Sequence, residues 1–111
     1  MPAPTIAELR THRYAVPAHF DAEVYQTLRA LDRRGVLAPH QLDKILPTLL
    51  RFRAQRVPLR GLLSDAHALG TRFSPRHAFY VALARRIGGE LFTRDRPLAT
   101  ACEGIVAARL F

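Results

Sequence analysis

The chain has 111 residues, a length that fits one domain with a modest hydrophobic core. It carries 17 basic and 9 acidic residues, so its formal net charge is +8. Its single cysteine, Cys102, excludes an internal disulfide and a cysteine-based zinc cluster and favours the reducing cytoplasm. No apolar run has the length of a membrane span or of a signal-peptide core, so we expect no membrane association.

The positive charge comes almost entirely from arginine, and Lys44 is the one lysine. The arginines are spread along the chain and form no basic tail. One interpretation is a basic face that binds nucleic-acid phosphates. The other is a solvated surface whose guanidinium groups pair with carboxylates of a partner. Composition alone leaves both interpretations open.

Short apolar segments alternate with helical patterns in the first half of the chain. We expect one or two helical turns over 5–11, a strand over 14–16 and a helix over 18–34. A further helix begins at Pro39 and contains Pro47, which should kink it or divide it near Leu46. The helix over 18–34 has apolar residues at spacings of four, four and three, which form one inward stripe: Phe20, Val24, Leu28 and Leu31.

The second half continues the alternation, with strands over 55–57, 90–92 and 105–108 and helices over 59–69 and 97–102. Ser74 and Pro75 begin a helix that Gly88 and Gly89 end. We expect these apolar residues to face inward: Leu62, Leu63, Ala66, Leu69, Ala78, Val81, Ala82 and Ile87. The helix that contains Pro47 carries the apolar residues Leu42, Ile45, Leu46, Leu49 and Leu50. The alternation predicts an α/β domain with a parallel sheet that spans residues 1–111.

Three carboxylates follow predicted strands. Asp21 and Glu23 begin the first long helix, and Asp95 follows the strand over 90–92. If both strands run the same way, these side chains meet at one end of the sheet, where oxygen ligands suit Mg²⁺ or Mn²⁺. The alternative is structural, because Asp95 is a good helix cap and acidic residues complement a helix start.

Two stretches together resemble the VapC-like PIN-domain ribonucleases, the toxins of bacterial type II toxin–antitoxin pairs. They are VPAHFDAEVYQTLRAL, with D-x-E-V, and SPRHAFYVALARRIGGELFTRDRPLA, with Y-V-A-L-A and T-x-D-x-x-L-A. The resemblance covers about residues 13–111. It implies a PIN-like three-layer α/β domain with a short parallel sheet, RNA as substrate and an antitoxin as protein partner.

In that family four acidic residues bind divalent ions that direct water at an RNA phosphodiester. The resemblance implies that Glu23 and Asp95 are catalytic metal ligands for Mg²⁺ or Mn²⁺, supported by Asp21 and Thr93. His77 stands where the family has an aspartate, and it suits Mg²⁺ poorly. It could ligate a softer ion such as Mn²⁺, Zn²⁺ or Ni²⁺, or, when protonated, pair with Glu23 or Asp95 in place of the ion.

The family's first strand, which carries another of these acids at the centre of the sheet, has no counterpart in the sequence. The strand at Tyr14 could move beside the strand at Leu91 and close the gap, or a second copy could pair there, so we expect a homodimer. With two acids absent, metal-dependent RNA cleavage should be weak or lost. The alternatives are a non-catalytic PIN-like protein that binds RNA or a partner, and a truncated form of an active toxin.

Overall fold

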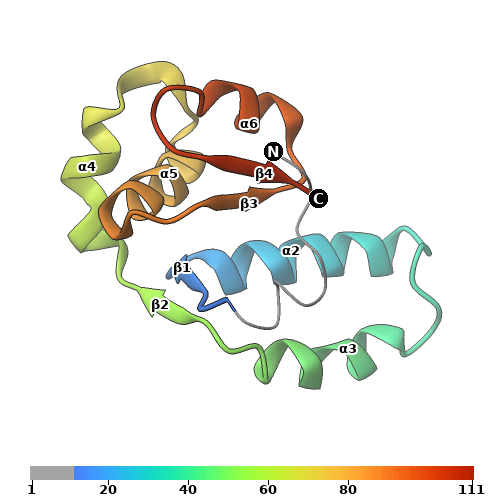
Figure 1. The fold of residues 1–111 in the computed structure, drawn as a ribbon. Helices are drawn as coiled ribbons and strands as arrows, with labels where there is room; N and C mark the ends of the chain where they lie inside the picture. The colour runs from blue at the N-terminus through green and yellow to red at the C-terminus, as the bar shows by residue number, and fades with distance from the viewer. Residues whose placement is uncertain (1–11) are drawn as a thin grey trace.

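The computed structural model describes residues 12–111 and shows an α/β fold of short strands and helices (Figure 1). The helix expected over 5–11 lies outside the described residues. In chain order the elements are β1 (Ala15–Pro17), α2 (Phe20–Arg33), α3 (Gln41–Leu50), β2 (Gln55–Val57), the 3₁₀ turn η1 (Leu59–Leu62), α4 (Leu63–Ala68), the 3₁₀ turn η2 (Gly70–Arg72), α5 (Pro75–Ile87), β3 (Leu91–Thr93), α6 (Arg96–Ala101) and β4 (Ala108–Leu110).

The strands form two parallel pairs. Strand β1 pairs with β2, with Val16 opposite Arg56, and β3 pairs with β4, with Phe92 opposite Arg109. Parallel pairing is therefore confirmed. The expectation that the strand at Tyr14 moves beside the strand at Leu91 is wrong, because β1 and β3 belong to separate sheets. A strand between the two pairs, from a second copy or elsewhere, stays a prediction.

Each strand of a pair has one backbone edge that faces away from its partner strand. The Leu91 N–H donates to Ala107 O at 2.9 Å, and the Phe111 N–H donates to Thr93 O at 3.2 Å. These bonds turn the backbone groups of Leu91 and Thr93 toward β4. Because successive residues of a strand turn their backbone groups to opposite edges, the N–H and C=O of Phe92 point to the other edge.

Helix α5 begins and ends where the sequence predicts. The Ser74 Oγ accepts the His77 N–H at 3.4 Å, and Pro75 occupies the first helical position, where its missing N–H costs nothing. Gly88 ends the helix at φ 66°, a left-handed conformation that favours glycine. Local chemistry therefore fixes both ends of the helix.

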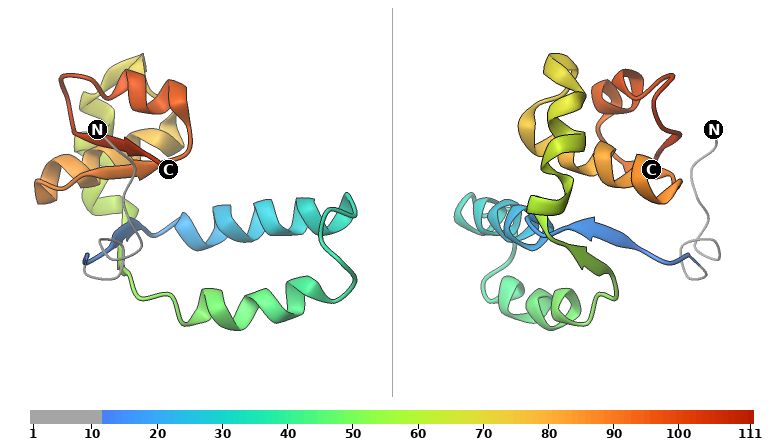
Figure 2. Two further views of the ribbon diagram at one scale, coloured as in Figure 1. Left: turned by 45° about the vertical axis from the view of Figure 1, so that its right-hand side comes forward. Right: turned by 90° about the vertical axis from the view of Figure 1, so that its left-hand side faces the viewer.

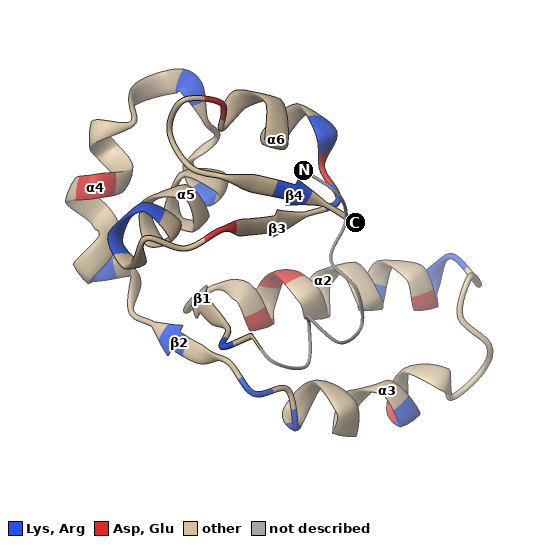
Figure 3. Ribbon diagram, in the orientation of Figure 1, with Lys and Arg blue, Asp and Glu red and all other residues tan. Residues whose placement is uncertain are grey.

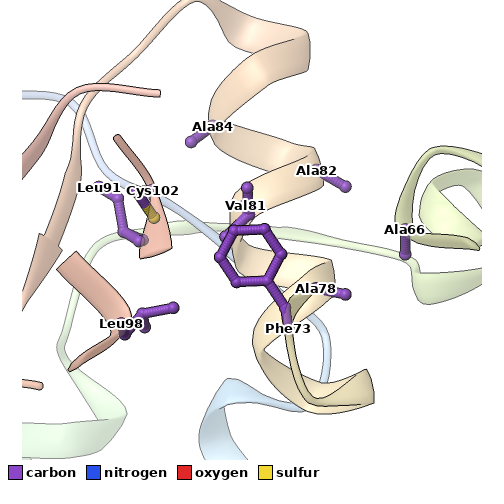
Figure 4. Close-up of a cluster of buried hydrophobic side chains, with 9 residues drawn as sticks. All are labelled: Ala66, Phe73, Ala78, Val81, Ala82, Ala84, Leu91, Leu98 and Cys102. Atoms are coloured by element: carbon purple, nitrogen blue, oxygen red, sulfur yellow. The ribbon is translucent and has the colours of Figure 1, made fainter. Parts of the chain in front are cut away.

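The hydrophobic core surrounds α5. Figure 4 shows Leu91, Leu98 and Cys102 on one side of the helix and Ala66 on its other side. Small side chains on α5 let its neighbours approach closely, and Val81 is completely buried. Helix α5 contacts both β1 and β3, so it joins the two strand pairs.

Helices α2 and α3 form an arm that extends from this core (Figure 2). Helix α2 has no buried residue, and α3 has one, Leu42. The predicted stripe on α2 is half-buried, and three of its residues, Phe20, Val24 and Leu28, line an open cavity toward α5 and β3. Within the same residues, no helix combines the length and the apolar composition that crossing a bilayer requires.

Several predicted details are wrong. Ile87 and Leu63 were expected to face inward, but both are 58% exposed. The expected helix over 59–69 is a 3₁₀ turn followed by the short α4. The last strand lies at 108–110 rather than 105–108, because its register is set by β3. Of the two effects expected of Pro47, division of the helix is wrong, since α3 continues to Leu50 with Pro47 inside, and a kink stays a prediction.

Candidate active site

A cavity of about 380 Å³ lies between α2, the start of α5 and the carboxyl end of β3. It brings together four of the five predicted site residues, and Asp21 is the one that does not line it. Its polar lining consists of Glu23, Thr27, Arg76, His77, Tyr80, Thr93 and Asp95, and its apolar lining of Phe20, Val24, Leu28, Leu91, Phe92 and Leu98.

Glu23 stands in the first turn of α2, and both of its carboxylate oxygens have partners. The Tyr80 hydroxyl donates to Oε1 at 2.7 Å, and His19 Nε2 lies 3.4 Å from the same oxygen. Arg76 Nη1 donates to Oε2 at 3.3 Å. The carboxylate therefore links α2 to α5.

Tyr80 is the closest of these partners. Burial raises the pKa of its phenol well above the ordinary value, and the hydrogen bond to Glu23 raises that pKa further. The phenol thus keeps its proton over the whole physiological range and serves as a permanent donor to Glu23. The His19 ring packs against Tyr80 with 5.1 Å between centroids, which keeps both rings beside the carboxylate.

Asp95 follows β3 and caps α6. Its Oδ1 accepts the Leu98 N–H at 2.9 Å, and its own N–H donates to Thr93 Oγ1 at 3.0 Å. The structural interpretation of Asp95 as a helix cap is therefore confirmed. The same turn directs Asp95 to the cavity, with Thr93 holding the turn, so capping and a role in the site are compatible.

Asp21 does not line the cavity, and it forms a structural ion pair with Arg56 instead. Arg56 donates to both of its carboxylate oxygens, at 3.0 and 2.9 Å, and these hydrogen bonds lower the pKa of Asp21. Arg56 Nη1 also donates to the carbonyls of Phe52 and Ala54, at 3.1 and 2.9 Å. This fork ties the start of α2 to β2 and its preceding loop.

His77 lines the cavity, but its imidazole forms no ion pair with Glu23 or Asp95 in the part of the chain that the structure describes. The partners of Glu23 are the Arg76 guanidinium and the His19 ring instead. Sequence reasoning missed both, together with Tyr80. The available signal was the four-residue spacing of His19 and Glu23, which places them on one helix face; the position of Arg76 depends on how α5 packs against α2.

The side chains of the cavity offer few free ligands for a divalent ion. Across residues 12–111, no three or more histidine, cysteine, aspartate or glutamate side chains form a cluster that could hold a metal ion. Both oxygens of Glu23 are engaged, one of them by a guanidinium, and Asp95 uses one oxygen as a cap. Divalent ions that prefer oxygen need several free carboxylate or carbonyl donors. The site as arranged does not fit such an ion.

Comparison with known proteins gives a consistent set of relatives. No protein-family model matches the chain. Ribonuclease VapC3 of Mycobacterium tuberculosis (strain H37Rv) is 38% identical over 92 residues, which cover 83% of this chain and 66% of that protein. Ribonuclease VapC12 of the same strain is 32% identical over 91 residues, 82% of this chain and 70% of that protein. Ribonuclease VapC3 of Pyrobaculum aerophilum is 40% identical over 81 residues, 69% of this chain and 62% of that protein.

These relatives agree with the α/β fold and with the motifs on α2, α5 and the turn after β3, which together indicate a PIN-domain protein. The chain belongs to the VapC family of PIN-domain ribonucleases. It spans about two thirds of the length of the M. tuberculosis relatives that it matches. The predicted family resemblance is confirmed.

Proposed function

We propose that the chain is a VapC-type toxin homologue of a toxin–antitoxin pair, with RNA as its substrate and an antitoxin as its protein partner. The observation that carries the proposal is the shared cavity of Glu23 and Asp95. These two carboxylates come from segments 72 positions apart in the sequence, and the fold brings both to one cavity beside Thr93. The names of the relatives, all ribonucleases, give the reaction class.

Cleavage by these residues should be weak. If a divalent ion, Mg²⁺ or Mn²⁺, were held here, it would supply activation of water and stabilisation of charge on the phosphodiester. Glu23 and Asp95 are the residues that would hold it, with His77 a further candidate for Mn²⁺. Since the present arrangement does not fit the ion, the residues of this chain contribute mainly by orienting RNA and the two carboxylates.

The test is an RNA-cleavage assay with purified protein in Mn²⁺ and in EDTA. We expect cleavage only with the ion, and a loss of about tenfold or more in Asp95→Asn and in Glu23→Gln. Asparagine still caps α6 and glutamine still accepts from Tyr80, so both variants should fold. The matched control is Asp65→Asn, which removes one negative charge from α4 outside the cavity, where Asp65 pairs with Arg86 at 2.8 Å. Cleavage that survives both cavity substitutions would contradict the proposal.

The second candidate function is RNA binding without cleavage. The observation that favours it is the guanidinium of Arg76 at Glu23, together with a net charge of +8 and basic positions on β2, α5 and β4 (Figure 3). Phosphate contacts of this kind weaken steeply with salt. Fluorescence anisotropy with labelled RNA should then show binding that falls sharply between about 50 and 200 mM salt, with intact RNA recovered.

We also propose a homodimer. The outer backbone edges of β1 and β3 have no strand partner among residues 12–111, and this supports it, since unpaired strand edges invite pairing with another chain. Light scattering at micromolar concentration should give twice the mass of the chain. A strictly monomeric protein would exclude this part of the proposal and leave the RNA-directed function intact.

A further inference from the structure

Glu23 is the most heavily contacted carboxylate of the cavity, and its two oxygens differ in how they are held. Oε1 faces Tyr80, whose hydroxyl is half-buried and 2.7 Å away, and His19 at 3.4 Å. Oε2 has a single contact among the described residues, the Arg76 guanidinium at 3.3 Å. One oxygen is therefore anchored, and the other is held by one long side chain.

The side chain of Arg76 can be displaced from Glu23 at little cost. Its side chain is 66% exposed, and Glu23 is the one ion-pair partner it has in the described structure. An exposed pair held through a single nitrogen is weak, because solvent screens it and a long side chain loses freedom to form it. The side chain of Glu23, by contrast, is 25% exposed and stays fixed through Oε1 when Arg76 moves.

We infer that Arg76 is a built-in cation that occupies Oε2 of Glu23 and competes with a divalent ion for this carboxylate. The inference rests on the proposed function, since it concerns the same cavity. It explains the poor fit of the site to an ion: the positive charge that Glu23 and Asp95 would draw from a metal is supplied to Glu23 by the chain itself.

His19 positions the backbone of Arg76 beside Glu23. Its Nε2 lies 3.2 Å from the backbone carbonyl of Arg76 and 3.4 Å from Glu23 Oε1, so one ring nitrogen contacts both partners of the pair. Its buried Nδ1 has no hydrogen-bond partner within residues 12–111. The ring is thus held through Nε2 and by packing against Phe79 and Tyr80. The first turn of α5 is thereby fixed to α2, with Arg76 beside Glu23.

The experiment measures Mn²⁺ binding directly, by the loss of the free-ion signal in electron paramagnetic resonance. We expect Arg76→Gln to bind Mn²⁺ about fivefold more tightly than the unaltered chain, because an exposed pair of this kind accounts for a factor of that order. Arg76→Lys keeps the charge and should stay near the unaltered chain. Adding Glu23→Gln to Arg76→Gln should remove the gain.

The matched control is Arg85→Gln, which removes the same charge from an exposed position in the last turn of the same helix. Equal gains in Arg76→Gln and Arg85→Gln would mean a general charge effect and would overturn the inference. Binding to none of the variants would also overturn it. If the chain cleaves or binds RNA but Arg76→Gln leaves Mn²⁺ binding unchanged, the inference is wrong and the proposed function stands. If Arg76→Gln binds Mn²⁺ more tightly but the protein neither binds nor cuts RNA, the inference stands and the proposed function is wrong.

Discussion

Two regions of the molecule are held in place differently. One consists of α5 and the segment from β3 to the chain end, and the other is the arm of α2 and α3. Helix α5 buries five of its thirteen residues, whereas α2 buries none of fourteen. The first region is stabilised by apolar packing around Val81 and Cys102. The arm is fixed to it at the cavity by polar contacts: Tyr80 to Glu23, Arg76 to Glu23 and His19 to the Arg76 carbonyl.

The candidate site spans both regions. Asp95 belongs to the packed region and Glu23 to the arm, so the relative position of the two carboxylates depends on a few hydrogen bonds more than on burial. Sub-global opening of the arm would separate the carboxylates while the core remained folded. Three predictions test this difference between the regions.

The largest expected effect comes from truncating a core leucine. Leu83→Ala on α5, where the side chain is 3% exposed, should lower the free energy of unfolding by about 3 kcal/mol. Leu31→Ala on α2 is the matched change at a half-buried position and should cost about 1 kcal/mol. Urea unfolding followed by circular dichroism measures both. Equal losses would mean that the arm is as tightly packed as the core.

The next effect comes from the hydrogen bond that joins the regions. Tyr80→Phe removes the donor to Glu23 and should cost about 1.5 kcal/mol, since hydrogen bonds to charged groups are stronger than neutral ones. Hydrogen exchange should speed up in α2 and stay unchanged in the middle of α5. Tyr25→Phe is the control, because Tyr25 is exposed on α2 and contacts only Arg29 among the described residues. Unchanged exchange in α2 would show that other contacts hold the arm.

The smallest effect is the pH dependence of the Asp21–Arg56 pair at the root of the arm. The folded-state pKa of Asp21 is lowered by its hydrogen bonds to Arg56, so the pair stabilises the fold above the unfolded-state pKa, about 4, and this contribution disappears as pH falls below it. Unfolding of the unaltered chain and Asp21→Asn should therefore differ at neutral pH and converge in acid. In an Arg56→Gln background the difference should be absent at every pH.

Elements with local signals could be predicted from the sequence. The start of α5 at Ser74–Pro75 and its end at Gly88 depend on capping chemistry that neighbouring residues supply. The predicted position of strand β4 was wrong for two reasons. The apolar residues before it, Ile105 and Val106, pack beside the core as part of a turn, and the register of the strand depends on β3, which is distant in the sequence.

The site shows the same division. Glu23 and Asp95 were found because helix starts and strand ends carry positional signals. Arg76 was not predicted, because no local sequence signal indicates which residue of the first turn of α5 contacts α2. Tertiary packing determines this contact, and it also determines the half-burial of the α2 stripe.

The split into two strand pairs has a consequence for how the molecule folds. A pair of three-residue strands is unstable alone in water, and α5 contacts both β1 and β3. Cooperativity between the halves must pass in large part through this helix. A chain with a weakened α5 would therefore unfold in two separate transitions, and calorimetry would register them as an apparent van't Hoff enthalpy below the measured heat.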